Sequence, residues 1–277
     1  KILRINMGAD GGPSGTVEPV GDYVGIGGRA MTSAIVSQEV PPLCHPLGEE
    51  NKVVIAPGLL CGTPASMTGR ISIGFKSPLT GGIKESNAGG PTGQIIARLG
   101  YAAIVIEGQP KDDTLYKIII NKDGFQILPD NSLKMSGNYD LIDKVKGDFG
   151  DDSSFMSIGQ AGEMKLAAAS IACTDAELRP TRHAGRGGGG AVMGSKGVKL
   201  IVFERVGTAS VVPADMSKFG DAHKVFTEGI KNHPVSGEGL PAYGSSVLTN
   251  VINEAGAYPT NNFKFGQFEG AEKISGE

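Results

Sequence analysis

The sequence of 277 residues contains no tryptophan, only three cysteines and no apolar run long enough to cross a membrane. The cysteines (Cys44, Cys61 and Cys173) are odd in number and widely spaced, so they form neither a disulfide framework nor a CxxC metal knuckle. We therefore expect a reducing, cytoplasmic setting and no membrane span. The net charge of −3 is not the basic footprint of a nucleic-acid-binding protein, so no nucleic-acid partner is expected.

The motifs of common hydrolases and metalloenzymes are also missing. The four histidines show no HExxH or paired spacing, and no G-x-S-x-G elbow occurs. The segment around Lys196 is not a P-loop, because no serine or threonine follows the lysine. We therefore predict no catalytic residue and no metal ligand in this chain. It is expected to bind a cofactor without supplying the reactive groups.

Glycine, in contrast, is abundant: the chain has 43, which is close to twice the usual share of about 7%. The glycines cluster without a G-X-Y period, which excludes collagen. Such clusters occur where the backbone turns tightly or approaches another group closely.

Apolar runs and turn signals predict many short strands and few helices in the first 210 residues. The expected strands cover residues 1–6, 53–56, 71–75, 102–107, 115–121, 125–128, 155–158, 166–171 and 200–203. The expected helices cover residues 28–38, 94–99 and 139–149. This pattern favours an α+β fold with mixed or antiparallel sheets over a regular βαβ array. No tandem repeat is detected.

The pattern of short apolar runs and glycine-rich turns ends near residues 206–213. Beyond this break we expect an amphipathic helix over residues 216–231, capped by Asp215, and a second helix over residues 247–255. The last residues are polar and end without a packing element, so the chain is expected to stop within a domain. We predict one domain over residues 1–208 and the beginning of a helical domain over residues 209–277.

Among the glycine-rich segments, residues 182–196 have the most unusual composition. Consecutive glycines expose N–H groups that hold anions, and a helix beginning near Gly190 would add its dipole. The guanidinium groups of Arg182 and Arg186 match phosphate or carboxylate oxygens. We interpret the segment as a site for a phosphate-bearing ligand; the alternative is a tight connection with solvated arginines. A dinucleotide fingerprint is disfavoured, because a polar stretch containing a proline precedes the glycines.

Two earlier segments contain further candidates. Asn87 stands beside paired glycines, where its amide could donate to and accept from a planar heterocycle while Gly89 permits close approach. The alternative is a structural turn, because asparagine tolerates left-handed backbone. Arg70 follows a Thr-Gly turn and precedes a strand; taken alone, it is more typical of a surface charge.

These stretches resemble the N-terminal part of the tungsten-dependent aldehyde ferredoxin oxidoreductase family. The matching stretches, in family order, are NKVVIAPGLLCGTPASMTGR, KSPLTGGIKESNAGG, GYAAIVIEG, SIGQAGE, AGRGGGGAVMGSK and AYGSSVLTNVINEAGAYPTNNF. The resemblance implies an α+β domain of two related sheets with short helices. This domain forms a base for a tungsten bis-pyranopterin (molybdopterin-type) cofactor whose phosphates are bridged by magnesium. It also implies that the cysteines of a [4Fe–4S] cluster lie beyond residue 277.

The resemblance also assigns cofactor-binding residues. Arg70 matches the arginine between pterin and cluster, and Asn87 and Gly89 match a pterin-contacting pair. The second pterin-binding loop is matched by Arg182, His183, Gly185 and Arg186. Small residues are usual in the family at the position of His183, and a larger residue is common at Gly189.

The function implied by the resemblance is oxidation of an aldehyde with water to a carboxylic acid. Two electrons would pass singly through the cluster to ferredoxin or an electron-transfer subunit, and a homodimer is an assembly that the resemblance allows. One alternative is a related tungsten or molybdenum enzyme with another substrate, for example one that reduces an aromatic acyl-CoA. The other is a non-catalytic scaffold fragment.

Overall fold

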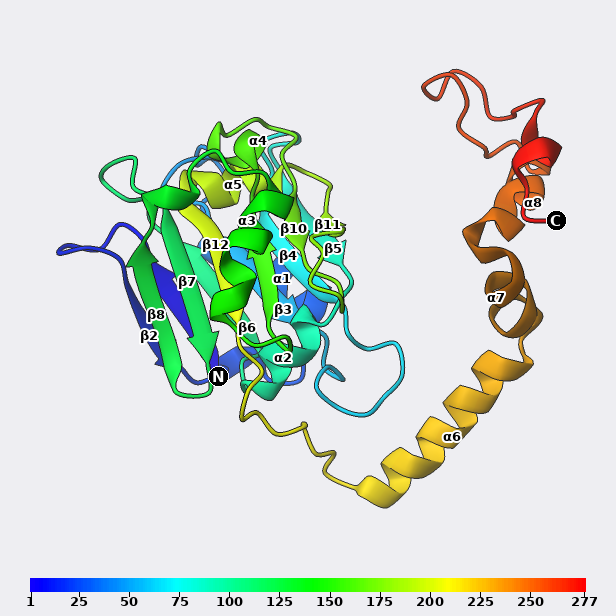
Figure 1. The fold of residues 1–277 in the computed structure, drawn as a ribbon, viewed down its shortest axis with the longest axis horizontal. Helices are drawn as coiled ribbons and strands as arrows, with labels where there is room; N and C mark the ends of the chain where they lie inside the picture. Colours follow the sequence, from blue (N-terminus) through cyan, green and yellow to red (C-terminus); the bar gives the residue numbers. More distant parts are fainter. The chain divides into compact units, whose positions relative to one another are not determined.

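A computed structural model describes residues 1–277, which divide into two compact units, Lys1–Val212 and Pro213–Glu277. The first unit contains two six-stranded sheets (Figure 1). The α+β class with two mixed sheets and short helices is thus confirmed. The domain limits 1–208 and 209–277 stay a prediction.

The first sheet has the strand order β2-β1-β6-β3-β4-β5. Its strands are β1 (Ile2–Asn6), β2 (Ser14–Glu18), β3 (Val53–Pro57), β4 (Ile71–Lys76), β5 (Ile83–Ala88) and β6 (Ala103–Glu107). Only β1 and β6 pair in parallel.

The second sheet has the order β11-β10-β9-β12-β7-β8. Its strands are β7 (Tyr116–Asn121), β8 (Gly124–Pro129), β9 (Ser154–Ser157), β10 (Ile171–Cys173), β11 (Arg182–Ala184) and β12 (Val198–Phe203). Here only β7 and β12 pair in parallel.

The two sheets repeat one topology, because each strand of the second sheet takes the place of the strand six earlier in the chain. The registers agree as well. Ile71 of β4 pairs with Ala88 of β5, and Ile171 of β10 pairs with Ala184 of β11. Helices recur at the same points: α1 (Gly28–Glu39) matches α3 (Asn138–Val145), and α2 (Thr92–Arg98) matches α5 (Gly189–Ser195). The expectation of two related sheets is therefore confirmed, although the repeat is not visible in the sequence.

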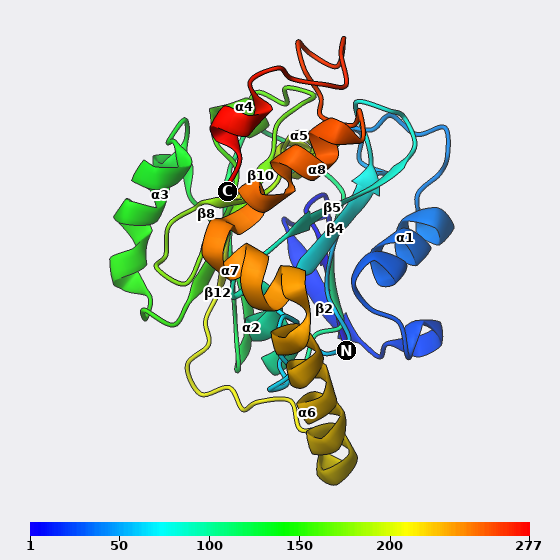
Figure 2. The same cartoon turned by 90° about the vertical axis from the view of Figure 1, so that its right-hand side faces the viewer.

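The core lies between the two sheets and is continuous across them. Alternate residues of each strand face this core, as Ile104 and Ile106 of β6 and Ile201 and Phe203 of β12 do. The opposite face of the first sheet packs against α1, and that of the second sheet against α3 (Figure 2). The short helices α2 and α5 each contact strands of both sheets. Because both faces of each sheet are covered, the central strands are buried along their length, and most of their residues are apolar.

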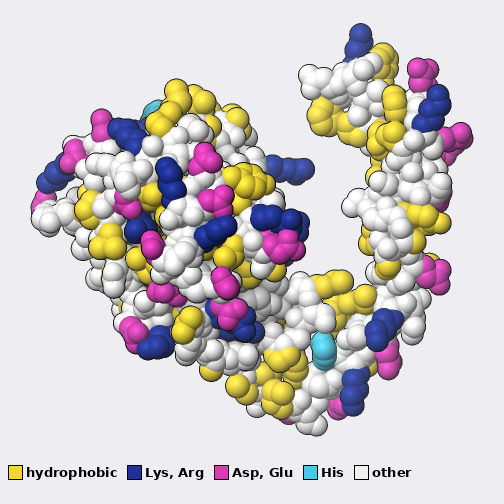
Figure 3. Space-filling model, in the orientation of Figure 1, with side chains coloured by type: hydrophobic (Ala, Val, Ile, Leu, Met, Phe, Trp, Pro, Cys, Tyr) yellow, Lys and Arg dark blue, Asp and Glu magenta, His cyan; other side chains and the backbone are white.

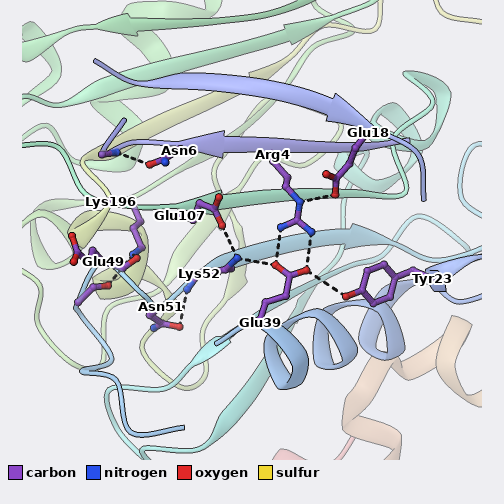
Figure 4. A network of polar contacts seen from close by, with 12 residues as sticks. Arg4, Asn6, Glu18, Tyr23, Glu39, Glu49, Asn51, Lys52, Glu107 and Lys196 are labelled. Atoms are coloured by element: carbon purple, nitrogen blue, oxygen red, sulfur yellow. Dashed lines mark hydrogen bonds and ion pairs between the residues drawn. The ribbon is translucent and has the colours of Figure 1, made fainter. Parts of the chain in front are cut away.

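Partly buried charges join β1, β2, β6, α1 and the residue before β3 (Figure 4). The Arg4 guanidinium donates to Glu18 at 2.5 Å and to both oxygens of Glu39 at 2.7 Å. Lys52 pairs with Glu39 at 2.7 Å and with Glu107 at 2.6 Å. Burial alone would raise the pKa of Glu39, but the bonds from Arg4 and Lys52 lower it to about 2. The carboxylate therefore stays ionised and ties α1 to the sheet.

Most predicted elements of the first unit are present, but one strand is wrong. Of residues 166–171, only Ile171 belongs to a strand, and the preceding residues turn, with Leu166 half exposed. The strands β2, β5 and β11 were not predicted. They contain polar residues such as Lys84 and Arg182 at sheet edges, where one side of the strand has no partner to bury it.

The second unit consists of short helical segments around α6 (Met216–Asn232). The predicted cap is confirmed, because the Asp215 side chain accepts from the N–H of Lys218 at 3.0 Å. The other α-helices are α7 (Leu240–Tyr243), α8 (Thr249–Glu254) and, in the first unit, α4 (Gln160–Glu163). Single 3-10 or π turns cover Gly21–Tyr23, Asn131–Leu133, Lys146–Asp148, Pro234–Gly239, Gly244–Leu248 and Ala271–Ile274. None of the helices has the length and apolar character needed to span a membrane.

Candidate functional site

The edge strands β5 and β11, one from each sheet, lie side by side (Figure 1). A hollow of about 700 Å³ lies beside them. Its lining includes Arg70, Asn87, Gly89, Arg182 and His183, so five of the seven predicted site residues share one cavity. These residues come from equivalent ends of the two structural repeats.

The other two predicted residues, Gly185 and Arg186, follow β11 and do not line this hollow. The backbone N–H of Arg186 donates to the Ser86 hydroxyl on β5 at 3.1 Å. This bond joins the two edge strands next to the hollow. A separate hollow of about 590 Å³ near Lys134 and Lys165 contains none of the predicted residues.

Asn87 and Arg70 form a hydrogen-bonded pair at one end of the hollow. The Nε of Arg70 donates to Oδ1 of Asn87. The Nδ2 of Asn87 donates to the Ser72 hydroxyl at 3.3 Å and to Glu85 Oε1 at 3.5 Å. The amide therefore has protein partners on both of its polar atoms. Its expected contact with a planar heterocycle stays a prediction.

Arginines without a carboxylate partner gather at this site. Four of the eight arginines are in ion pairs, namely Arg4, Arg29, Arg179 and Arg205. The other four are not: Arg98 on α2 does not line the hollow, whereas Arg70, Arg182 and Arg186 lie at or beside it. On the face in Figure 3, basic and acidic side chains are interspersed. Three guanidinium forks without acidic partners are an arrangement suited to a phosphate-bearing ligand.

The glycine run has two different roles in the structure. Gly188, Gly189 and Gly190 are buried, and a Cβ atom on Gly188 would lie 2.0 Å from the Ala167 carbonyl oxygen. A Cβ on Gly190 would lie 2.3 Å from the carbonyl oxygen of Ser170. Gly188 and Gly190 thus let α5 pack against the turn before β10. The N–H of Gly190 donates to the Ala169 carbonyl at 2.8 Å, and the interpretation of the run as a main-chain anion nest stays a prediction.

Gly89 and Gly185 behave differently from the buried glycines. A Cβ on Gly89 would meet only Arg70 Nη1, at 3.4 Å, and one on Gly185 would meet only the His183 side chain, at 3.9 Å. Both glycines directly follow an edge strand, so they are equivalent in the two repeats. They leave room for a ligand to approach the main chain on either side.

The loop before β11 is held by Asp175, which sequence reasoning did not assign to the site. Its carboxylate accepts from Arg179 N at 3.0 Å, Glu177 N at 3.0 Å and the Thr181 hydroxyl at 2.9 Å. Burial alone would raise the pKa of Asp175, but these bonds lower it to about 2. Asp175 therefore lines the hollow as a carboxylate and positions Arg182 and His183.

The fold and site together define a duplicated α+β base with a cationic hollow between the edges of its two sheets. The family description "Aldehyde ferredoxin oxidoreductase, N-terminal domain" matches residues 2–205, and "Aldehyde ferredoxin oxidoreductase, domains 2 & 3" matches residues 221–277. The chain belongs to the aldehyde ferredoxin oxidoreductase family.

Individual relatives agree with this assignment. The chain is 38% identical over 281 residues to a tungsten-containing aldehyde ferredoxin oxidoreductase of Thermococcus kodakarensis, covering 100% of this chain and 44% of the relative. It is 39% identical over 255 residues to the protein of that name from Pyrococcus furiosus, covering 91% and 40%. The chain thus spans less than half the length of these relatives.

A solved structure has the same fold. It is the active site complex BamBC of benzoyl coenzyme A reductase in complex with 1,5-dienoyl-CoA, with a TM-score of 0.77 and 26% identity. The match covers 99% of this chain and 42% of the other.

Proposed function

We propose that residues 1–277 form the cofactor-binding base of a tungsten-containing aldehyde ferredoxin oxidoreductase. The observation that carries this proposal is the position of Arg70, Arg182 and Arg186. All three lack carboxylate partners, and they lie at or beside the hollow between β5 and β11. Relatives named as tungsten-containing enzymes match the whole chain.

The duplicated architecture supports a ligand made of two like halves. Equivalent strand ends meet at the hollow, and each is followed by an open glycine, Gly89 in one repeat and Gly185 in the other. A tungsten bis-pyranopterin has two like halves, and each would find an equivalent stretch of backbone. The arginines would hold its phosphates, which magnesium would bridge.

In this account the chain binds and orients the cofactor, which supplies the redox chemistry when bound. That chemistry would convert an aldehyde and water to a carboxylic acid. The two electrons would leave singly through a [4Fe–4S] cluster to ferredoxin, in a reducing cytoplasmic setting that suits the three free cysteines. The cluster ligands would come from outside these residues, as the resemblance to the family implies. The complete protein would assemble as a homodimer.

A second candidate function is reduction of an aromatic acyl-CoA on the same base. It is favoured by the TM-score of 0.77 to the benzoyl coenzyme A reductase complex. The higher identity to aldehyde oxidoreductases, 38% against 26%, favours the first candidate. Turnover of aldehydes with ferredoxin, compared with turnover of benzoyl-CoA, separates the two functions.

The test of the proposed function is elemental analysis of the complete native protein, purified anaerobically. About one tungsten and four irons per polypeptide, with aldehyde-dependent reduction of ferredoxin, are expected. Molybdenum instead of tungsten would keep the base and change the assignment of the metal. A complete chain without either metal would contradict the proposal and leave a scaffold role.

A further inference from the structure

Arg70 and Asn87 in the first repeat occupy the same places as Ser170 and His183 in the second. The correspondence follows from the strand registers, since each of these residues directly precedes one member of the matching Ile–Ala pairs of β4/β5 and β10/β11. Each pair is also joined by a side-chain hydrogen bond. The two repeats therefore present one geometry at the hollow with different chemical groups.

In the first repeat, the group directed at a ligand is Arg70. Asn87 has protein partners on both amide atoms, whereas the Nη atoms of Arg70 have none. Gly89 leaves the space next to Nη1 open. Asn87 thus orients the arginine through its Oδ1.

In the second repeat, the shorter Ser170 cannot take the place of the arginine. Its hydroxyl lies 2.9 Å from Nδ1 of His183, and Nε2 of the histidine has no protein partner. His183 is exposed and lines the hollow. The imidazole is therefore held at one nitrogen and free to bond at the other.

We propose that His183 hydrogen-bonds the second half of the cofactor directly through Nε2, and that Ser170 is the positioning residue that orients it. Asn87, at the equivalent place, acts only through Arg70. The two halves of the cofactor would thus be held differently by equivalent positions. This inference rests on the proposed function, because it needs a cofactor in the hollow.

Two substitutions distinguish a ligand contact from a structural role. The amide of His183→Gln reaches about as far as Nε2, whereas that of His183→Asn reaches about as far as Nδ1. The measurement is tungsten retained by the complete protein after anaerobic desalting. We expect His183→Ala and His183→Asn to lose tungsten about tenfold faster than wild type, and His183→Gln to retain it. Ser170→Ala should lose it more slowly than His183→Ala.

The opposite pattern would overturn the inference. If only the bond to Ser170 mattered, His183→Asn would retain tungsten and His183→Gln would not. Equal retention by all variants would also overturn it. Thermal midpoints serve as a control and should be unchanged, because the His183 side chain is exposed. A wild-type protein without tungsten would overturn the proposed function itself, so the two failures are distinguishable.

Discussion

The backbone N–H of Val211 donates to the carbonyl of Gly62 at 2.9 Å. Gly62 also donates its own N–H to Oε1 of Gln94 on α2. Nε2 of the same glutamine donates to the Thr68 hydroxyl at 3.2 Å. The loop before Arg70 is thus held from two sides, by α2 and by the last residues of the first unit.

Substitution of Gly62 by alanine should destabilise this loop. Gly62 has a φ of +83°, and a Cβ there would lie 2.6 Å from Cγ2 of Val211. Gly81 is the matched control, because its φ is +72° but no atom lies within 4 Å of a Cβ. We expect Gly81→Ala to cost about 1 kcal/mol from backbone strain and Gly62→Ala about 1–3 kcal/mol more from the contact. Shifts in urea midpoint measure both, and equal shifts would contradict the packing role of Val211.

The ion pair between Lys199 and Glu163 should be costly to break. Both side chains are buried, at 0% and 5% exposure, and Lys199 also donates to the carbonyls of Ser136 and Ile158 at 2.9 and 2.6 Å. We expect Lys199→Met to lower the free energy of opening β12 by about 3–5 kcal/mol, because the carboxylate is left buried and unpaired. Native-state hydrogen exchange of the β12 amides measures this cost.

The control for that experiment is Lys146→Met, which removes an exposed pair with Asp143. It should change the free energy of opening β12 by no more than about 1 kcal/mol. A similar effect of both substitutions would show that burial of the Lys199 pair is not what stabilises β12.

Lys196 should make stability depend on pH. Its side chain is fully buried and donates to the carbonyls of Gly48 and Glu49 at 2.9 and 3.0 Å (Figure 4). Desolvation lowers its pKa to about 8, whereas the unfolded chain has the usual value of 10.5. Between these values the unfolded state binds more protons, so the contribution of Lys196 to stability rises with pH.

The comparison is between wild type and Lys196→Met from pH 7.5 to 10. The wild type should gain thermal midpoint relative to the variant as the pH rises through this window. Using the difference removes the tyrosines, whose raised pKa values act in the other direction at alkaline pH. A constant difference would contradict the lowered pKa of Lys196.

Arg186→Ala should reduce cofactor occupancy far more than folding stability. Arg186 has no carboxylate partner, so its removal leaves no buried charge unpaired. Arg205→Ala is the control, because it removes an exposed arginine that pairs with Asp152 away from the hollow. We expect a loss of tungsten content of about tenfold or more for Arg186→Ala only, since charge-assisted bonds to phosphate are strong. Full tungsten content with a lowered thermal midpoint would refute the phosphate role.

The central strands could be predicted from sequence because their physical signal is local. Ile104 to Ile106 and Leu200 to Phe203 are apolar on both faces, as strands buried between layers must be. The edge strands could not be predicted in this way. β5 reads IKESNA, and its strand conformation depends on pairing with β4, a tertiary contact that periodicity does not show.

The candidate site shows the same division. Arg70, Asn87 and Arg182 could be singled out because arginines and asparagine beside glycines are unusual. The partners Ser72, Ser170 and Asp175 could not, since they reach the site only through strand register and loop packing. The Ala-Gly that follows both Asn87 and His183 is a signal of the repeat, but it is too short to distinguish from chance.

The central claim is that the tungsten cofactor rests on the hollow between β5 and β11. Anomalous scattering at the tungsten absorption edge, from crystals of the complete holoprotein, tests this claim most directly. The account predicts one strong peak over the hollow lined by Arg70, Asn87 and His183. A tungsten peak elsewhere, for example over the hollow near Lys134 and Lys165, would contradict the account.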